Sequence, residues 1–466
     1  MIDTQALRNK ILDLAMCGKL VEQRPEEGTG EELYQKILAE KARLVKEGKI
    51  KKQKPLPEIT EDEKPFEIPE SWKWVHIDII GESSLGKTLN KSLDKGYFVN
   101  YLCSINIRWD GIDLTQLKSA YFSAEEKEKY KLKKGDLLIC EGGDIGRSAV
   151  WEKDTEMYYQ NALHRVRFFE GINPFFYKYL IQFYKNIGLL DNVAKGVTIR
   201  HLVQNALYSL WIPLAPIEEQ NRIITCLKSV FNELSYLDKL QMRYIDSCFV
   251  LKSKLLDTAI RGDLVEQRIE EGTGEGLYQQ IQKEKEKLIK EGKIKKQKPL
   301  PEITEDEKPF EIPKNWKWCR IGSAFNLQSG KNISASEILE DKTETHEYPC
   351  YGGNGVRGYT KEYNREGTFP IIGRQGALCG NINIAMGKFY ATEHAVVVDC
   401  FNILDPIWAS WFLKALNLNQ YATATAQPGL AVSKINDVLI PLPPLAEQKR
   451  IVAKLEELLP LCNQLK

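Results

Sequence analysis

The string KIKKQKPLPEITEDEKPFEIP occupies residues 49–69 and occurs again, letter for letter, at residues 293–313. The copies are 244 residues apart, and the match continues on both sides at the same spacing. LVEQRPEEGTGEELYQKI from Leu20 matches LVEQRIEEGTGEGLYQQI from Leu264, while SWKW and NWKW follow the two strings. Self-similarity at a fixed spacing indicates a repeated architecture. The chain therefore contains two copies of one frame.

A second motif closes each copy of this frame. IPLAPIEEQNRI begins at Ile212, and IPLPPLAEQKRI begins at Ile440. Between the paired segments, residues 75–210 and 319–438 share almost no sequence. We therefore expect two unlike variable domains carried by a duplicated frame.

The composition is typical of a soluble, multidomain protein. A chain of 466 residues is long for a single core, and its 43% hydrophobic and 28% charged residues exclude wholesale disorder and a membrane class. The net charge of +1 means that a nucleic-acid surface would need local segregation of charge. No stretch approaches about 18 apolar residues, and the N-terminus lacks a signal core. We expect a cytoplasmic protein, with ten reduced cysteines and no metal site.

The segment from Glu218 to Arg261 carries the apolar pattern of a long coiled-coil helix. At 1.5 Å per residue it would extend about 65 Å. Gln241 falls at a seam position, where a polar residue often fixes the register. An ordinary core helix is the alternative for one such segment, but the duplication favours a spacer. The predicted seam residues, which recur in steps of four and three, are Ile223, Leu227, Val230, Leu234, Leu237, Tyr244, Cys248, Leu251 and Leu255.

The terminal helices are expected to supply the counterpart of this central helix. The seam pattern begins again at 447–465, and the N-terminal helix 4–16 resembles the second half of the central helix. We expect two antiparallel helical spacers and a pseudo-twofold axis within a monomer. Each repeated segment before the connector predicts a short amphipathic helix closed by Gly48 or Gly292. The connector itself, basic and then acidic, is expected to be extended.

Two variable domains, each introduced by IPxxWKW and closed by IPLxPxxEQxRI before a long helix, resemble the DNA specificity subunit of type I restriction-modification systems. The resemblance covers essentially the whole chain. It implies α/β recognition domains that read the two parts of an asymmetric DNA site, held apart by the helices. It also implies two methyltransferase subunits that bind S-adenosylmethionine, and ATP-driven restriction subunits. This chain would itself be non-catalytic and without a cofactor.

This interpretation divides the chain into six segments. They are the N-terminal helix, short helix and connector (1–70), recognition domain 1 (71–213), the central spacer helix (214–263), the second short helix and connector (264–314), recognition domain 2 (315–441) and the C-terminal spacer helix (442–466).

Glycine-rich basic segments of the variable domains are the candidate DNA-contacting loops, because glycine lets a backbone approach phosphate closely. They are EGGDIGR from Glu141, GKT from Gly86, YGGNGVRGY from Tyr351 and GRQGALCGN from Gly373. Arginine can pair with guanine, and Asn or Gln with adenine, through two hydrogen bonds. The candidate base readers are Arg147, Arg357, Arg374, Asn354 and Gln375.

Other residues of these domains are candidates for phosphate or polar contacts. Phosphate contacts give affinity without sequence information. The phosphate candidates are Lys87, Lys331 and Arg200, and the further polar candidates are Asn161, His164, His201 and His394. A surface turn or a buried, hydrogen-bonded side chain is the alternative interpretation of each.

Three familiar motifs do not carry their usual function here. GESSLGKT at 81–88 fits a phosphate-binding loop, but the following residues form a poor helix. An NTPase using Lys87 and Thr88 is kept as an alternative, as is a coiled-coil scaffold without a DNA role. The GxGxxG of residues 353–358 lacks a following helix, and NPFF at 173–176 lacks the second proline of adenine methyltransferases.

Overall fold

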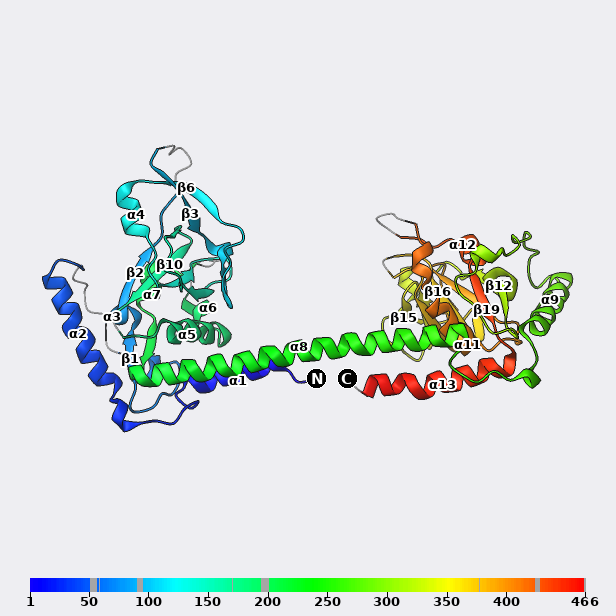
Figure 1. Cartoon of the computed structure of the whole chain (residues 1–466), viewed down its shortest axis with the longest axis horizontal. Helices are drawn as coiled ribbons and strands as arrows, with labels where there is room; N and C mark the ends of the chain where they lie inside the picture. The colour runs from blue at the N-terminus through cyan, green and yellow to red at the C-terminus, as the bar shows by residue number, and fades with distance from the viewer. Residues whose placement is uncertain are drawn as a thin grey trace. The chain divides into compact units, whose positions relative to one another are not determined.

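The computed structural model describes residues 1–50, 57, 59–89, 95–169, 171–193, 201–376, 378–423 and 428–464. The chain forms two compact units, which we call unit 1 (Met1–Gln241) and unit 2 (Met242–Lys466) (Figure 1). Their boundary falls inside one helix, α8 (Ile217–Arg261), of 45 residues. The predicted long central helix is therefore confirmed.

The frame of unit 1 consists of two helices and a small sheet. Helix α1 (Thr4–Met16) begins at Asp3, whose carboxylate accepts a hydrogen bond from the Ala6 backbone. Helix α2 (Gly30–Lys46) begins with a capping box formed by Thr29 and Glu32 and ends before Gly48, which has φ +70°. Strand β1 (Lys73–His76) pairs antiparallel with β11 (Trp211–Leu214), so both ends of the variable domain leave from one two-stranded sheet.

Helix α1 runs antiparallel along the first half of α8 (Figure 1). The Ile2 backbone N–H donates to Gln241 Oε1 at 2.7 Å, and Gln241 Nε2 donates back to the Ile2 carbonyl at 3.2 Å. Arg8 forms a 2.9 Å ion pair with Asp238. Gln241 therefore holds the end of α1 in place, in keeping with the register-fixing role expected of a polar seam residue.

The variable domain of unit 1 has two principal sheets. The first has strand order β2-β10-β7-β8 and the second β6-β3-β9, with a separate hairpin β4-β5. The strands are β2 (Gly81–Leu85), β3 (Tyr97–Leu102), β4 (Ile107–Arg108), β5 (Gly111–Ile112), β6 (Lys118–Phe122), β7 (Leu137–Cys140), β8 (Ser148–Val150), β9 (Tyr158–Tyr159) and β10 (Leu163–Phe168). The helices are α3 (Ile77–Ile80), α4 (Ala124–Tyr130), α5 (Pro174–Asn186), α6 (Leu189–Val193) and α7 (Gln204–Tyr208).

Unit 2 repeats the frame around a different variable domain. One sheet of six strands has the order β13-β18-β16-β17-β14-β15. The frame elements are α9 (Gly274–Lys290), β12 (Lys317–Arg320), β19 (Leu439–Leu442) and α13 (Leu445–Gln464). The other elements are α10 (Ile321–Ala324), β13 (Asn326–Ser329), β14 (Tyr348–Gly352), β15 (Gly355–Thr360), β16 (Arg365–Gly373), β17 (Ile382–Ala391), β18 (Ala395–Asp399), α11 (Pro406–Ala415) and α12 (Val432–Asp437). The mixed α/β type predicted for both variable domains is confirmed.

Within unit 2, α13 packs against the second half of α8. Ala259 and Ile260 of α8 share a buried core with Ile451 and Leu455 of α13. Each unit thus pairs one half of α8 with a terminal helix. The pseudo-twofold relation between the two copies stays a prediction.

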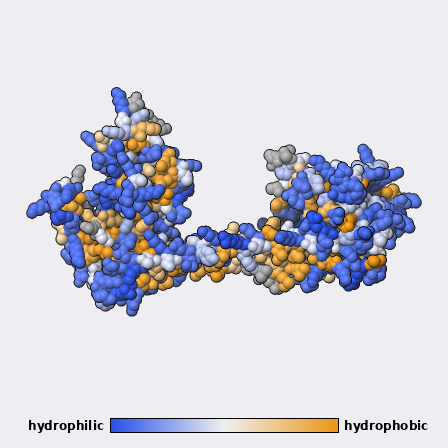
Figure 2. All heavy atoms as spheres, viewed as in Figure 1, coloured by the Kyte–Doolittle hydropathy of each residue, from blue (hydrophilic) through white to orange (hydrophobic). Residues whose placement is uncertain are grey.

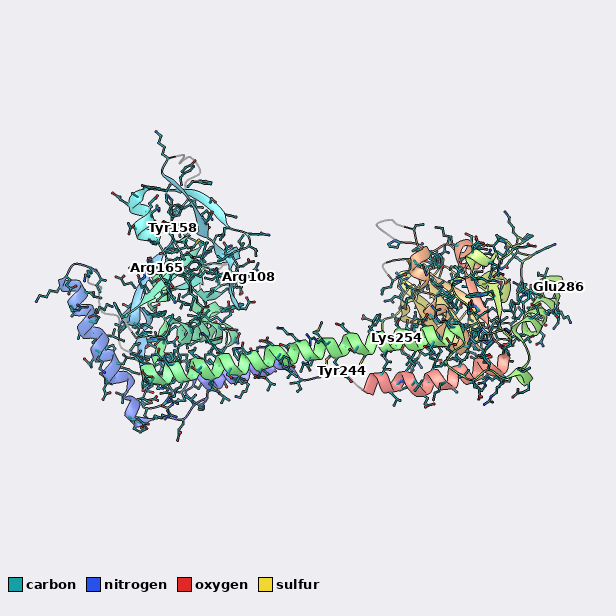
Figure 3. All side chains as sticks on the ribbon, in the orientation of Figure 1. Arg108, Tyr158, Arg165, Tyr244, Lys254 and Glu286 are labelled. Carbon is teal, nitrogen blue, oxygen red and sulfur yellow. The ribbon has the colours of Figure 1, made fainter. Side chains whose placement is uncertain are left out.

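The predicted seam of α8 is buried along only part of its length. Ile223, Leu227, Leu234 and Cys248 are buried, and Val230, Leu237, Tyr244 and Leu255 are half-buried; Figure 3 labels Tyr244 on α8. Leu251 is 44% exposed. Figure 2 shows hydrophobic residues at the surface along α8. The large apolar side chains that α8 exposes are Tyr236, Leu240, Met242, Phe249, Val250 and Leu251.

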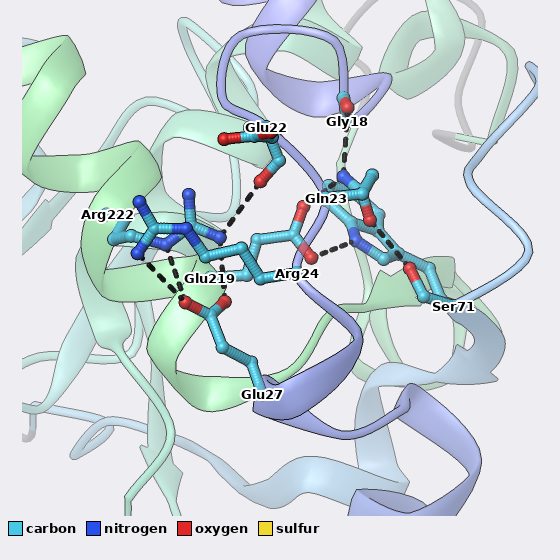
Figure 4. Close-up of polar contacts among 9 residues, drawn as sticks. Gly18, Glu22, Gln23, Arg24, Glu27, Ser71, Glu219 and Arg222 are labelled. Carbon is cyan, nitrogen blue, oxygen red and sulfur yellow. Dashed lines mark hydrogen bonds and ion pairs between the residues drawn. The ribbon is translucent and has the colours of Figure 1, made fainter.

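The closing motif of the frame is explained by a polar junction in unit 1 (Figure 4). The Glu219 carboxylate is buried and accepts hydrogen bonds from Trp72 Nε1 at 2.9 Å and from Gln23. Arg222 binds both oxygens of Glu27, at 2.8 and 2.7 Å. Glu219 and Arg222 therefore join the start of α8 to the segments before α2 and before β1.

The same junction occurs in unit 2. Trp316 Nε1 donates to Glu447 at 2.9 Å, and Arg450 binds both oxygens of Glu271, at 2.9 and 2.7 Å. The Glu and Arg of EQxRI are thus structural in both copies, which accounts for their repetition in the sequence.

Candidate nucleic-acid interface

The two variable domains share a backbone arrangement although their sequences are unlike. The dipeptide Gly–Lys follows β2 in unit 1 and β13 in unit 2, and each dipeptide makes the same pair of backbone hydrogen bonds. These bonds are Gly86 N to Leu163 O (3.1 Å), Lys87 N to Tyr159 O (3.1 Å), Gly330 N to Ala395 O (2.9 Å) and Lys331 N to Ala391 O (2.9 Å).

Both glycines are required by close backbone approach. A Cβ on Gly86 would lie 2.3 Å from the Gln160 carbonyl oxygen, and one on Gly330 would lie 2.2 Å from that of Ala391. These distances are far below van der Waals contact, so any larger residue would force the strands apart. The glycines of the two GK segments therefore have a packing role.

The lysines that follow these glycines differ in exposure. Lys87 is 2% exposed, and its ammonium bonds Glu126 and the Tyr121 carbonyl and lies 4.4 Å from the Phe122 ring centre. Lys331 is exposed. Residues 81–85 form strand β2 rather than a phosphate-binding loop, which removes the structural basis of the NTPase alternative.

Unit 2 has a hollow of about 760 Å³ beside the β14–β15 turn and the loop after β16. Its lining brings together four of the predicted DNA-contacting residues, Asn354, Arg357, Gln375 and His394. They come from segments up to 40 residues apart in the sequence. Arg374 adjoins this group, and its Nη1 donates to Ser329 Oγ at 3.2 Å. We call this region the unit 2 hollow.

Buried polar atoms without a hydrogen-bond partner gather around the unit 2 hollow. Within the part of the chain that the structure describes, they include Arg374 Nε, Asn383 Nδ2, Thr392 Oγ1, Glu393 Oε2 and His394 Nδ1. Buried polar groups in folded proteins are normally paired with other protein groups or with water, so these atoms can accept further hydrogen-bond partners. His394 Nε2 also lies 3.1 Å from Glu393 Oε1. The hollow therefore presents donors and acceptors together.

The loop after β7 in unit 1 corresponds to the loop after β16 in unit 2. Matching backbone hydrogen bonds establish this equivalence. They are Cys140 N to Arg147 O (2.8 Å) with Gly373 N to Asn381 O (2.9 Å), Glu141 N to Ala162 O (3.0 Å) with Arg374 N to His394 O (3.0 Å), and Leu202 N to Glu141 O (2.8 Å) with Leu430 N to Arg374 O (2.8 Å).

Unlike side chains occupy these equivalent positions. Unit 1 has Glu141 where unit 2 has Arg374, and Ala162 where unit 2 has His394. A carboxylate only accepts hydrogen bonds, whereas a guanidinium only donates them. The two loops therefore share a backbone conformation, but one presents a hydrogen-bond acceptor where the other presents a donor.

The predicted contacts of unit 1 are less available than those of unit 2. Arg147 is 21% exposed at its side chain, and its Nη2 donates to the Ser104 carbonyl at 2.8 Å. Asn161 is half-buried and its Oδ1 accepts a hydrogen bond from Gln160 at 3.2 Å. His201 is exposed. Arg200 lies outside the described residues.

His164 is fully buried, and its Nε2 lies 2.6 Å from the Leu202 carbonyl. Burial lowers the pKa of its imidazole. Because the imidazole of His164 and the ammonium of Lys87 are both enclosed, neither side chain is exposed for contact with DNA.

The sequence interpretation did not select one exposed residue of unit 1 and three residues near the unit 2 hollow. They are Arg108, Asn381, Glu393 and Leu378, of which Arg108 and Leu378 are exposed. The Asp–Gly pair at 110–111 is a hairpin signal that could have indicated the turn next to Arg108. Glu393 and Asn381 carry no local signal, because only strand pairing brings them to the hollow.

Across the described ranges, no group of three or more His, Cys, Asp or Glu residues is placed to hold a metal ion. Among the helices described, none combines the length and apolar character needed to cross a membrane.

Comparisons with a family model and with known proteins agree on one family. The model of the type I restriction modification DNA specificity domain matches residues 69–241 and 313–466. The chain is 29% identical to the type I restriction enzyme EcoAI specificity subunit of Escherichia coli, over 99% of this chain and 90% of that protein.

Two solved structures share its fold. One, from work on complex assembly and conformational transition of the type I R-M system, has a TM-score of 0.61 at 18% identity, covering 86% of this chain and 93% of that one. The HsdS subunit from Thermoanaerobacter tengcongensis has a TM-score of 0.52 at 16% identity, covering 86% and 92%.

Proposed function

Since the chain belongs to the family of the type I restriction modification DNA specificity domain, we propose that its two variable domains read the two parts of a bipartite, asymmetric DNA site. The observation that carries this proposal is the unlike chemistry on equivalent loops, Glu141 in unit 1 and Arg374 in unit 2. A dimer of identical readers recognises a palindrome. Two unlike readers on one frame select an asymmetric pair of sequences.

In unit 2, the proposed base contacts surround the unit 2 hollow. An arginine such as Arg357 or Arg374 can donate two hydrogen bonds to a guanine, and Asn354 and Gln375 can pair with an adenine. Lys331 is exposed and suits a phosphate contact. The unpaired buried atoms of Arg374 and His394 support a site whose polar groups are completed by a ligand.

The chain itself is proposed to be non-catalytic and cytoplasmic, and to dock subunits that carry out the chemistry. Two methyltransferase subunits would bind S-adenosylmethionine and modify adenine, and restriction subunits would use ATP. The exposed apolar side chains of α8, among them Tyr236, Met242 and Phe249, support a protein contact along that helix. The DNA would be double-stranded, and the isolated chain would be a monomer.

Selection of binding sequences from a randomised duplex library by the purified full chain tests this function. We expect a motif of two parts separated by a spacer of fixed length that is not read. Binding should weaken steeply with salt, because phosphate contacts release counterions. Replacing residues 71–213 with a different recognition domain should change one part of the motif only.

Other outcomes would overturn the proposal. A chain that does not bind DNA would be a helical scaffold, and a chain that binds DNA without sequence preference would not read a site. A single unbroken motif would exclude two separate readers.

A further inference from the structure

We infer that Arg108, in the hairpin β4–β5, is the principal guanine-reading side chain of unit 1. This inference rests on the proposed function and names the residue that reads one part of the site. It assigns to the hairpin the place that the β14–β15 turn occupies in unit 2.

The strand pairing establishes that these places are equivalent. In unit 1, β3 lies between β6, to which it is antiparallel, and β9, to which it is parallel. In unit 2, β14 lies in the same way between β15 and β17. A tight turn at 353–354 joins β14 to β15, whereas residues 103–117, which include the hairpin, join β3 to β6. The inserted segment therefore starts where the turn beside the unit 2 hollow starts.

A side-chain hydrogen bond ties each of these connections to the neighbouring loop. In unit 2, Asn381 Nδ2 donates to Asn354 Oδ1 at 3.1 Å. In unit 1, Arg147, which is equivalent to Asn381, donates to the Ser104 carbonyl at 2.8 Å. Arg147 thus positions the inserted segment, and it does so with its guanidinium, which donates to the Ser104 carbonyl.

The hairpin is held rigidly against the loop of Glu141–Arg147. Trp109 Nε1 donates to Asp144 Oδ2 at 3.0 Å, and Ile107 is fully buried in the core. Asn106 Nδ2 donates to the carbonyls of Asp113 and Gln116, at 3.0 and 2.9 Å. A reader needs such support, because a loosely held side chain discriminates poorly between bases.

Arg108 is free to meet DNA. Its side chain is 55% exposed and lies at the edge of unit 1 (Figure 3). Its ion pair with Asp113, at 3.7 Å, is long and open to solvent, and such pairs contribute little. A two-stranded ribbon fits the major groove, and the planar guanidinium matches the O6 and N7 acceptors of guanine.

The test compares three variants of the full chain in the library selection. Arg108→Ala should relax the choice at one base pair in one part of the motif, lowering discrimination there by about 5- to 150-fold. Arg108→Lys keeps the charge but loses the fork and should also relax that position. Arg43→Ala removes a similarly exposed arginine from α2 and should leave the motif unchanged.

Two results would overturn the assignment. An unchanged motif in Arg108→Ala would show that another residue reads this part. A uniform loss of affinity on all sequences, with Arg108→Lys restoring it, would make Arg108 a phosphate contact. Both presuppose that the unaltered chain selects a two-part motif; if it selects none, the proposed function fails instead.

Discussion

The buried carboxylate of Glu219 shows how one residue holds the frame together. It is enclosed at the start of α8, and burial raises its pKa above the ordinary value of 4.5, while the hydrogen bonds from Trp72 and Gln23 oppose that rise. Glu447 has the same surroundings, with Trp316 and Gln267 as donors, and its pKa is raised in the same way. A group so placed is costly to ionise, yet its donors require an acceptor.

Removing this acceptor should destabilise unit 1. Glu219→Ala leaves the buried Trp72 Nε1 without a partner, and we expect a loss of about 1–3 kcal/mol in the free energy of unfolding. Urea denaturation at neutral pH measures the loss. Glu218→Ala, at the exposed neighbouring position, should change stability by less than about 0.5 kcal/mol. Equal effects of both substitutions would contradict the assigned role.

The raised pKa of Glu219 predicts a pH dependence of stability. The folded state holds the proton more tightly than the unfolded state, so the stabilisation is complete below pH 4.5 and is lost as the pH rises through the folded pKa. Glu219→Gln keeps an acceptor for Trp72 but cannot titrate. Its stability relative to the wild type should therefore increase between pH 4.5 and neutrality. A difference that stays constant with pH would refute this explanation.

At the scale of elements, the two short frame helices differ at one informative position. Helix α2 has the capping box of Thr29 and Glu32, whereas Thr273 of α9 faces Gly276 at the same place. The Thr273 hydroxyl still accepts from the Gly276 backbone at 3.1 Å, but the reciprocal carboxylate is missing. Glycine also lowers helix stability through its backbone entropy.

Restoring the capping box should stabilise α9. Gly276→Glu is expected to gain about 1–2 kcal/mol from the added cap and the better helix former. Hydrogen exchange should show the gain as slower exchange of α9 amides that open locally. Glu32→Gly is the matched control and should speed exchange in α2 by a similar factor. Unchanged exchange in both helices would indicate that caps do not limit their stability.

At the scale of the whole molecule, the buried clusters assign each unit its own core. The largest cluster of unit 1 ends at Leu227, and that of unit 2 begins at Ala259. Each unit contains a complete copy of the frame, including its own Trp–Glu junction. Units with separate cores are expected to unfold in separate steps.

Matched glycine substitutions test this independence. Gly86→Ala and Gly330→Ala introduce the same close contact into different units, and calorimetry of the full chain should show each lowering a different unfolding transition. We expect a loss of about 1–3 kcal/mol in the affected unit from overpacking. If both substitutions lowered one common transition, the two units would be a single cooperative structure.

The sequence by itself determined the duplicated frame, the long helix and the family, because these depend on local periodicity and on motifs that lie close together along the chain. It also selected, as candidate DNA contacts, segments that the structure brings together at the unit 2 hollow, since glycine with Arg, Asn or Gln is informative without knowledge of contacts. The burial of Lys87 and His164, the engagement of Arg147 and the exposure of Arg108 were decided only by the tertiary structure. Strand pairing between distant segments determines which side chains reach the surface. The sequence repeat does not extend into the variable domains, so it gives no information about the pairing there.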